Sequence, residues 1–94
     1  MTQVLQTPSF KKVLKKIHQN QKKELDSAIL EIIKNPYQGE QKKGVLSDVF
    51  VYKFKMVNQL TLLAYMYNGS QIILLDLGSH ENFYRDLQKR RLPE

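Results

Sequence analysis

The residues best suited to chemistry gather near the C-terminus of this 94-residue chain. His80 follows an apolar run, Tyr84 comes four residues later, and the three arginines are Arg85, Arg90 and Arg91. An imidazole, with an unperturbed pKa of ~6.5, transfers protons readily near neutral pH. Guanidinium groups bind phosphate oxygens through planar, bidentate hydrogen bonds. The cluster therefore indicates phosphate-ester chemistry, although a surface histidine that caps a terminal helix would fit the same sequence.

Two lysines form a second candidate group. Lys53 and Lys55 stand two residues apart in an alternating segment, so both project from one face of the expected strand. Ammonium groups at this spacing can bracket a phosphate and stabilise its transition state. The alternative is ordinary strand charge that discourages aggregation. Further candidates for contact with a phosphate backbone are Lys42, Lys43, Arg90 and Arg91.

Composition limits the possible classes of protein. The length predicts a single domain over residues 1–94, and the absence of cysteine excludes disulfides and thiolate metal sites. With only two histidines, far apart in the sequence, we expect neither a metal site nor a small-molecule cofactor. The net charge of +6 favours a polyanionic partner, either nucleic acid or an acidic protein. No apolar run reaches the ~20 residues that span a bilayer, and the N-terminus does not resemble a secretory signal, so we expect a cytoplasmic protein.

The first half of the chain has helical periodicity. Thr7 followed by Pro8 is typical of a helix start, and apolar residues then recur at helical spacing as far as Ile17. A second helix is predicted from about Gln21 to Asn35, where the following proline stops it. The polar stretch around residues 19–20 would join the two helices into a hairpin.

The second half has strand periodicity. Residues 37–44 are expected to form a loop, and alternation begins at Asp48. Two more strands, over 59–67 and 71–77, flank the dipeptide Asn68-Gly69, which favours a two-residue hairpin turn. That turn would pair residue 65 with residue 72 and residue 63 with residue 74. A short basic helix or tail is expected from His80 to Arg91, and residues 2–6 could add an N-terminal strand.

The expected architecture is an α+β domain with the order β-α-α-β-β-β-α. An N-terminal helical hairpin packs on one face of a three- to four-stranded antiparallel sheet, followed by a short C-terminal helix. The helical and strand periods select one core between the hairpin and the sheet. Its predicted members are Phe10, Val13, Leu14, Ile17, Leu25, Ile29, Ile32, Phe50, Tyr52, Phe54, Leu63, Tyr65, Ile72 and Leu74.

The opposite face of the sheet is also apolar. The alternation places five apolar residues on the same side as Lys53 and Lys55. This face is either a partner site or is covered by the C-terminal helix. The five residues are Leu62, Ala64, Met66, Ile73 and Leu75.

The order and spacing of these segments resemble the RelE/ParE superfamily of bacterial toxins from toxin–antitoxin systems. The resemblance rests on the opening at residues 7–12, on Tyr52-Lys53-Phe54-Lys55, and on the Leu-Gly-Ser-His segment that ends at His80. It implies a cognate antitoxin and, for members that cleave messenger RNA in the ribosomal 30S A site, a metal-independent endoribonuclease. Lys53 and Lys55 match two catalytic lysines of RelE-type members, and His80 and Tyr84 match a catalytic histidine and an aromatic residue of the YafQ-like branch.

The chain departs from both branches. RelE-type toxins typically carry Tyr-Arg in the middle strand, where this sequence has Thr61 and Leu62, so Arg85 and Arg90 are the nearest substitutes for the phosphate-binding arginine. YafQ-like toxins use further central histidines, and this chain has none between His18 and His80. Two alternatives therefore stay open. One is a ParE-like inhibitor of DNA gyrase without nuclease activity, and the other is a non-catalytic basic binding domain.

Overall fold

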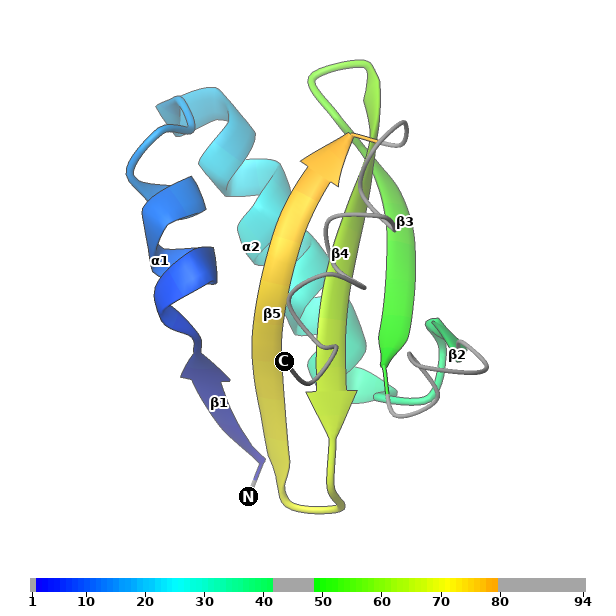
Figure 1. Cartoon of the computed structure of the whole chain (residues 1–94). Helices are drawn as coiled ribbons and strands as arrows, with labels where there is room; N and C mark the ends of the chain where they lie inside the picture. Colours follow the sequence, from blue (N-terminus) through cyan, green and yellow to red (C-terminus); the bar gives the residue numbers. More distant parts are fainter. Residues whose placement is uncertain (1, 42–48, 80–94) are drawn as a thin grey trace, which may run out of the picture.

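The computed structural model describes residues 2–41 and 49–79. In this part, two helices lie on one face of a five-stranded sheet whose strand order is β1-β5-β4-β3-β2 (Figure 1). The elements are β1 (Gln3–Gln6), α1 (Pro8–Leu14), α2 (Gln19–Lys34), β2 (Glu40–Gln41), β3 (Phe50–Met56), β4 (Gln59–Tyr67) and β5 (Gln71–Ser79). The α+β class and the helical hairpin are confirmed. None of the described helices is long and apolar enough to cross a membrane.

Helix α1 begins where the sequence predicts. The Thr7 hydroxyl oxygen accepts a hydrogen bond from the Phe10 backbone N–H at 3.3 Å, and Pro8 occupies the first helical position. The Thr7 backbone N–H also donates to the Leu74 carbonyl at 3.1 Å. This hydrogen bond joins the start of α1 directly to β5, and the apolar face of the helix packs against the sheet.

Helix α2 begins earlier than predicted. It starts at Gln19, so residues 15–18 form the connection, and the predicted connection at residues 19–20 is wrong. The Gln21 side-chain oxygen accepts from the His18 backbone N–H at 2.8 Å, which satisfies an otherwise unpaired amide at the helix start. At the other end, the helix stops at Lys34, with Asn35 as its cap ahead of Pro36.

The sheet is mixed, and the prediction of an antiparallel sheet with three to four strands is wrong in two places. Strand β1 runs parallel to β5, with Gln3 opposite Gln71, because both helices and three strands separate them in the chain and no tight turn forces them to be antiparallel. The segment predicted to be a loop at residues 37–44 contains β2, which pairs with the first two residues of β3. The predicted C-terminal helix at 80–91 lies outside the described residues.

The hairpin of β4 and β5 is shifted from the predicted register. Tyr65 lies opposite Leu74, and Leu63 lies opposite Leu77. The side-chain oxygen of Asn68 accepts hydrogen bonds from the backbone N–H groups of residues 70 and 71, so Asn68 precedes the turn and Gly69, with φ 94°, begins it. An irregularity between Ala64 and Tyr65 then adds one residue to β5. Since the pairing of Tyr65 slips by two residues, Ile72 and Leu74 keep their predicted face, whereas the extra residue reverses the alternation beyond it and turns Leu77 toward the main core.

The main core lies between the helices and the sheet and contains every residue predicted for it. Phe10, Leu25 and Ile32 from the helices are fully buried against Leu63, Tyr65, Ile72 and Leu74 from the sheet. The main core also includes five residues that were not predicted from the sequence: Val4, Ile33, Met56, Tyr67 and Leu77.

A second cluster lies on the opposite face of the sheet. Val49, Val51, Leu62 and Ala64 are buried together, with Met66 and Leu75 partly buried against them. The prediction that Leu62, Ala64, Met66 and Leu75 share this face is confirmed. The region of the sheet that surrounds the two candidate lysines is therefore stabilised by apolar packing on both sides.

Candidate functional site

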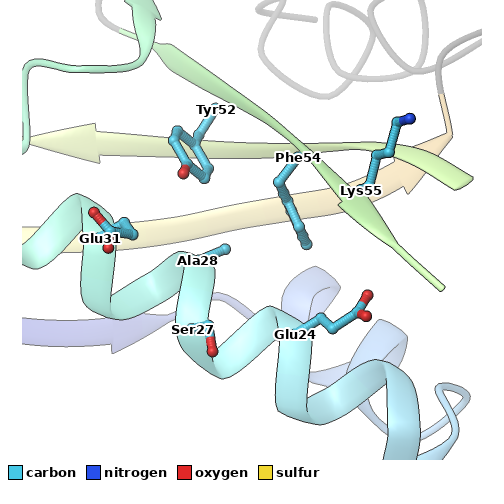
Figure 2. Close-up of a pocket in the computed structure, with 7 residues that line it drawn as sticks. All are labelled: Glu24, Ser27, Ala28, Glu31, Tyr52, Phe54 and Lys55. Carbon is cyan, nitrogen blue, oxygen red and sulfur yellow. The ribbon is translucent and has the colours of Figure 1, made fainter. Parts of the chain in front are cut away.

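Lys53 and Lys55 lie on the face of β3 that points away from the helices. Both are exposed, whereas Tyr52 and Phe54 pack against the main core. Figure 2 shows the rings of Tyr52 and Phe54 directed toward α2, while the Lys55 ammonium group points the other way. The predicted strand parity is confirmed, and it brings the two lysines together on one face.

Lys53 has a carboxylate neighbour. Its Nζ atom lies 3.9 Å from Oε2 of Glu40, and both side chains are about half exposed. Glu40 lies there because β2 pairs with β3 and sets it opposite Val51, on the lysine face. An exposed pair of this kind contributes less than ~1 kcal/mol to stability, so its main effect is on the local charge. Within residues 2–41 and 49–79, Lys55 has no such ion pair.

A buried phenol fixes the position of β2. The Tyr65 hydroxyl donates to the Pro36 carbonyl at 2.7 Å and accepts from the Gly39 backbone N–H at 3.2 Å. Burial raises the pKa of the Tyr65 phenol above its ordinary value. The contact leaves no room for a larger residue, because a Cβ atom at position 39 would lie 2.7 Å from the phenol oxygen. Tyr65 therefore holds the segment that presents Glu40 to Lys53.

The other end of β3 closes in a strained turn. Val57 and Asn58 both have positive φ, 51° and 65°, as a two-residue type I′ hairpin requires. The Val57 backbone N–H donates to Oε2 of Glu24, on α2, at 2.5 Å. An open pocket of about 300 Å³ lies between α2 and β3 at this end. It is lined by Glu24, Ser27, Ala28, Glu31, Tyr52, Phe54 and Lys55 (Figure 2).

The middle strand supplies no cation at the position where RelE-type toxins carry arginine. Thr61 and Leu62 are both buried, and the Thr61 hydroxyl donates to the Gln59 carbonyl at 3.0 Å. Across the sheet, Thr61 lies opposite Phe54 on one side and Ser79 on the other. The described end of β5 is therefore level with the lysine-bearing end of β3. Two strand spacings, roughly 10 Å in all, separate them.

The structure places two of the predicted site residues, Lys53 and Lys55. The other seven lie outside the described residues: His80, Tyr84, Arg85, Lys42, Lys43, Arg90 and Arg91. In the described ranges, no group of three or more histidine, aspartate or glutamate residues is arranged to hold a metal ion.

Sequence reasoning did not find Glu24, Glu40 or the Tyr65 hydroxyl. For Glu24 and Glu40 no local signal exists, because each acts on a residue that only the tertiary fold brings near. Tyr65 was recognised as a core residue. Its phenol oxygen was a usable signal, because a buried hydroxyl normally requires hydrogen-bond partners.

Comparisons with known proteins identify relatives of this fold. Free E. coli toxin RelE, carrying two arginine-to-alanine substitutions, aligns with a TM-score of 0.75 at 17% identity over 97% of this chain and 98% of that one. The E. coli RelBE toxin–antitoxin complex aligns with a TM-score of 0.70 at 14% identity, covering 86% and 99%. A conserved hypothetical protein of Helicobacter pylori aligns with a TM-score of 0.54 at 26% identity, covering 85% and 96%.

Sequence comparison gives the family. No curated protein matches the sequence. A family model described as the ParE-like toxin of type II bacterial toxin–antitoxin systems matches residues 4–88, nearly the whole chain. With the RelE-like fold already established, this match places the chain in that family, and the protein is a toxin of the RelE/ParE type.

Proposed function

We propose that this toxin is an endoribonuclease that cleaves messenger RNA on the ribosome and so inhibits translation. The observation that carries the proposal is that Lys53 and Lys55, both exposed, lie on the same face of β3. Ser79, at the level of the same end of the sheet, directly precedes His80 in the sequence. Two cations can stabilise the charge on a phosphate and an imidazole can transfer protons, and RNA cleavage by its own 2′-hydroxyl uses both effects.

In this mechanism the 2′-oxygen of the RNA attacks the adjacent phosphorus. His80 takes part in proton transfer, which consists of removal of the 2′-hydroxyl proton and protonation of the leaving 5′-oxygen. Lys53, Lys55 and Arg85 stabilise the negative charge that builds up on the phosphorane, and Tyr84 stacks on a splayed base. The P–O5′ bond breaks as the P–O2′ bond forms, so the products carry a 2′,3′-cyclic phosphate and a 5′-hydroxyl. Neither a metal ion nor an organic cofactor takes part.

The partners follow from the family. A cognate antitoxin would bind and neutralise the toxin, as the RelBE complex illustrates for E. coli RelE. The RNA substrate lies in the 30S A site. Lys42, Lys43, Arg90 and Arg91 add non-specific attraction to RNA, in keeping with the net charge of +6. Both partners are cytoplasmic.

Inhibition of DNA gyrase is the second candidate function. It is favoured by the identity of Thr61 and Leu62, because these residues stand where RelE-type toxins typically carry Tyr-Arg and neither is a cation. The family model is also described by its likeness to ParE. A gyrase inhibitor needs the fold but none of the nuclease residues, so the two functions make opposite predictions for variants of the lysine face.

The deciding experiment uses purified toxin in two parallel assays. One contains programmed ribosomes with messenger RNA in the A site, and the other contains DNA gyrase with relaxed plasmid. We expect messenger cleavage that resists EDTA, with ribosome integrity controlled, and 2′,3′-cyclic phosphate ends. Intact messenger RNA together with blocked supercoiling would overturn the nuclease proposal.

The His80→Ala variant tests the chemistry itself. Because positioned proton transfer is typically worth about 10²–10⁴-fold in rate, we expect a loss of that order with the circular dichroism spectrum unchanged. The Lys34→Ala variant is the matched control for charge. Lys34 is an exposed lysine on α2, where it pairs with Glu31, and its removal lowers the net charge without touching the lysine face. Full activity of a folded His80→Ala variant would contradict the assignment.

A further inference from the structure

The turn between β3 and β4 is held by a residue far away in the sequence. The Val57 backbone N–H donates to the carboxylate of Glu24, 33 residues earlier, at 2.5 Å. Val57 is the first central residue of a turn closed by the Met56–Gln59 pair, so its amide has no place in the strand ladder. It needs an acceptor from elsewhere, and α2 supplies one.

The turn also needs restraint because of its backbone. Type I′ turns favour asparagine and glycine, yet this turn places a β-branched residue, Val57, at a φ of 51°. Such a conformation is a genuine outlier for valine and persists only where the surroundings determine it. No glycine stands at either central position to relieve it. The Glu24 contact is the described interaction that fixes the turn from outside the hairpin.

Lys55 lies two residues before this turn, on the last part of β3. Lys55 and Glu24 line the same open pocket, and Figure 2 shows Glu24 projecting from α2 toward the end of β3. We propose that Glu24 is a positioning residue for Lys55: its carboxylate fixes the strained turn and, through it, the strand end that presents the Lys55 ammonium group to the scissile phosphate. This inference rests on the proposed nuclease function, in which Lys55 binds that phosphate.

A matched set of variants tests the proposal in the ribosome cleavage assay. Because small misplacements of a catalytic group cost up to about 10²-fold, we expect Glu24→Ala to lower kcat roughly tenfold and to change KM little. Glu24→Gln keeps an oxygen that accepts the Val57 hydrogen bond and should restore most of the rate. Glu31→Ala is the control and should behave as wild type, because Glu31 lines the same pocket but pairs with Lys34 on its own helix.

The double variant Glu24→Ala/Lys55→Ala separates positioning from general destabilisation. If Glu24 acts through Lys55, adding Glu24→Ala to Lys55→Ala should cause no further loss. The proposal would be overturned if Glu24→Ala lowered the rate by the same factor in the Lys55→Ala background as in the wild type. A folded Glu24→Ala protein with wild-type kcat would also overturn it.

Amide hydrogen exchange, measured by NMR on the whole protein, gives a readout independent of activity. The Val57 amide should exchange slowly in the wild type and in Glu31→Ala, and faster in Glu24→Ala. If the wild-type protein does not cleave messenger RNA, the proposed function fails by itself. Loss of protection in Glu24→Ala would still support the restraint of the turn by Glu24, and unchanged protection would overturn it.

Discussion

The two ends of β3 are held in different ways. At its start, the strand pairs with β2, whose position is fixed by the fully buried Tyr65 hydroxyl through Pro36 and Gly39. At its other end, the strand enters a turn in which the backbone N–H of Val57 donates a hydrogen bond to the Glu24 carboxylate, and both residues are exposed. A buried hydrogen-bond network is costly to break, whereas a solvated contact competes with water. The first end is therefore held more firmly than the second, whose position depends on the single contact with Glu24 described here.

The two candidate lysines lie near different ends of β3 and differ in their charged neighbours. Lys53 is near the firmly held end and shares its charge with Glu40, at 3.9 Å. Lys55 is near the turn, and its ammonium group has no carboxylate partner in the described part of the chain. In the proposed mechanism a phosphate would compete with Glu40 for Lys53, whereas no carboxylate of the described residues would compete with it at Lys55. Two lysines that look equivalent in the sequence thus have unequal surroundings in the described part of the fold.

Among changes at the two ends of β3, the largest effect should come from Lys55, although it should stay below that of His80→Ala. Removing one preorganised charge from a transition-state site costs about 10²-fold or more in rate, and we expect a loss of this order in kcat/KM for Lys55→Ala. Lys53→Ala should lose less, because Glu40 already offsets part of its charge. Messenger cleavage by purified variants, with Lys34→Ala as the control, measures both. A larger loss for Lys53→Ala would reverse the comparison between the two ends.

Substitution at Gly39 should disturb the buried end most. The new Cβ atom of Gly39→Ala would meet the Tyr65 hydroxyl oxygen at 2.7 Å and the ring beyond it. Since overpacking typically costs about 1–3 kcal/mol, we expect a loss of that size in the free energy of unfolding. Urea denaturation measures the change. Gly69→Ala is a comparison with a different cause, because position 69 has open space but a φ of 94°. Wild-type stability of Gly39→Ala would show that the phenol contact is loose.

The burial of apolar faces was predictable because it depends on local periodicity. Phe54 and Lys55 were assigned to opposite faces correctly, since side chains alternate along any strand. The slip at Asn68 did not change the faces of Ile72 and Leu74, because a shift of two residues leaves the parity intact, whereas the extra residue after Leu74 reversed it for Leu77. Strand β2 and the parallel pairing of β1 were missed, because two residues carry too little pattern and strand direction depends on the path of the whole chain.

In the candidate site, too, local periodicity predicted some residues, whereas others are brought together only by the tertiary fold. Lys53 and Lys55 were predictable as a pair because two residues on one strand keep their spacing wherever the strand lies. Glu24 and Glu40 were not, because their contacts with Val57 and Lys53 join segments that are 33 and 13 residues apart. His80 and Arg85 remain sequence predictions, since both lie outside the described residues.

An effect of similar size is expected from removal of the Tyr65 hydroxyl, and it depends on pH. Its pKa is raised by burial, so the unfolded chain ionises first, near pH 10. The stability associated with the neutral phenol is complete below that pH and is lost as pH rises through the folded pKa. Tyr65→Phe leaves the Gly39 amide without its acceptor, which costs about 1–3 kcal/mol, and removes this pH dependence. Urea denaturation between pH 8 and pH 11, compared for wild type and variant, measures both; parallel curves would contradict the prediction.

The smallest effect should come from Val57→Asn in the turn, and this substitution should stabilise the protein rather than destabilise it. Asparagine tolerates the left-handed conformation that Val57 adopts, and Val57 is 43% exposed, so Val57→Asn gives up little burial. We expect it to raise the free energy of unfolding by about 0.5–1 kcal/mol, because backbone strain at such positions is of order 1–3 kcal/mol. The backbone N–H is retained, so the Glu24 contact survives.

Combining Val57→Asn with Glu24→Ala then sharpens the comparison of the two ends. If strain makes the turn depend on Glu24, the relaxed turn should lose less activity when Glu24 is removed. An equal loss in both backgrounds would show that the restraint acts on something other than the strained backbone of Val57.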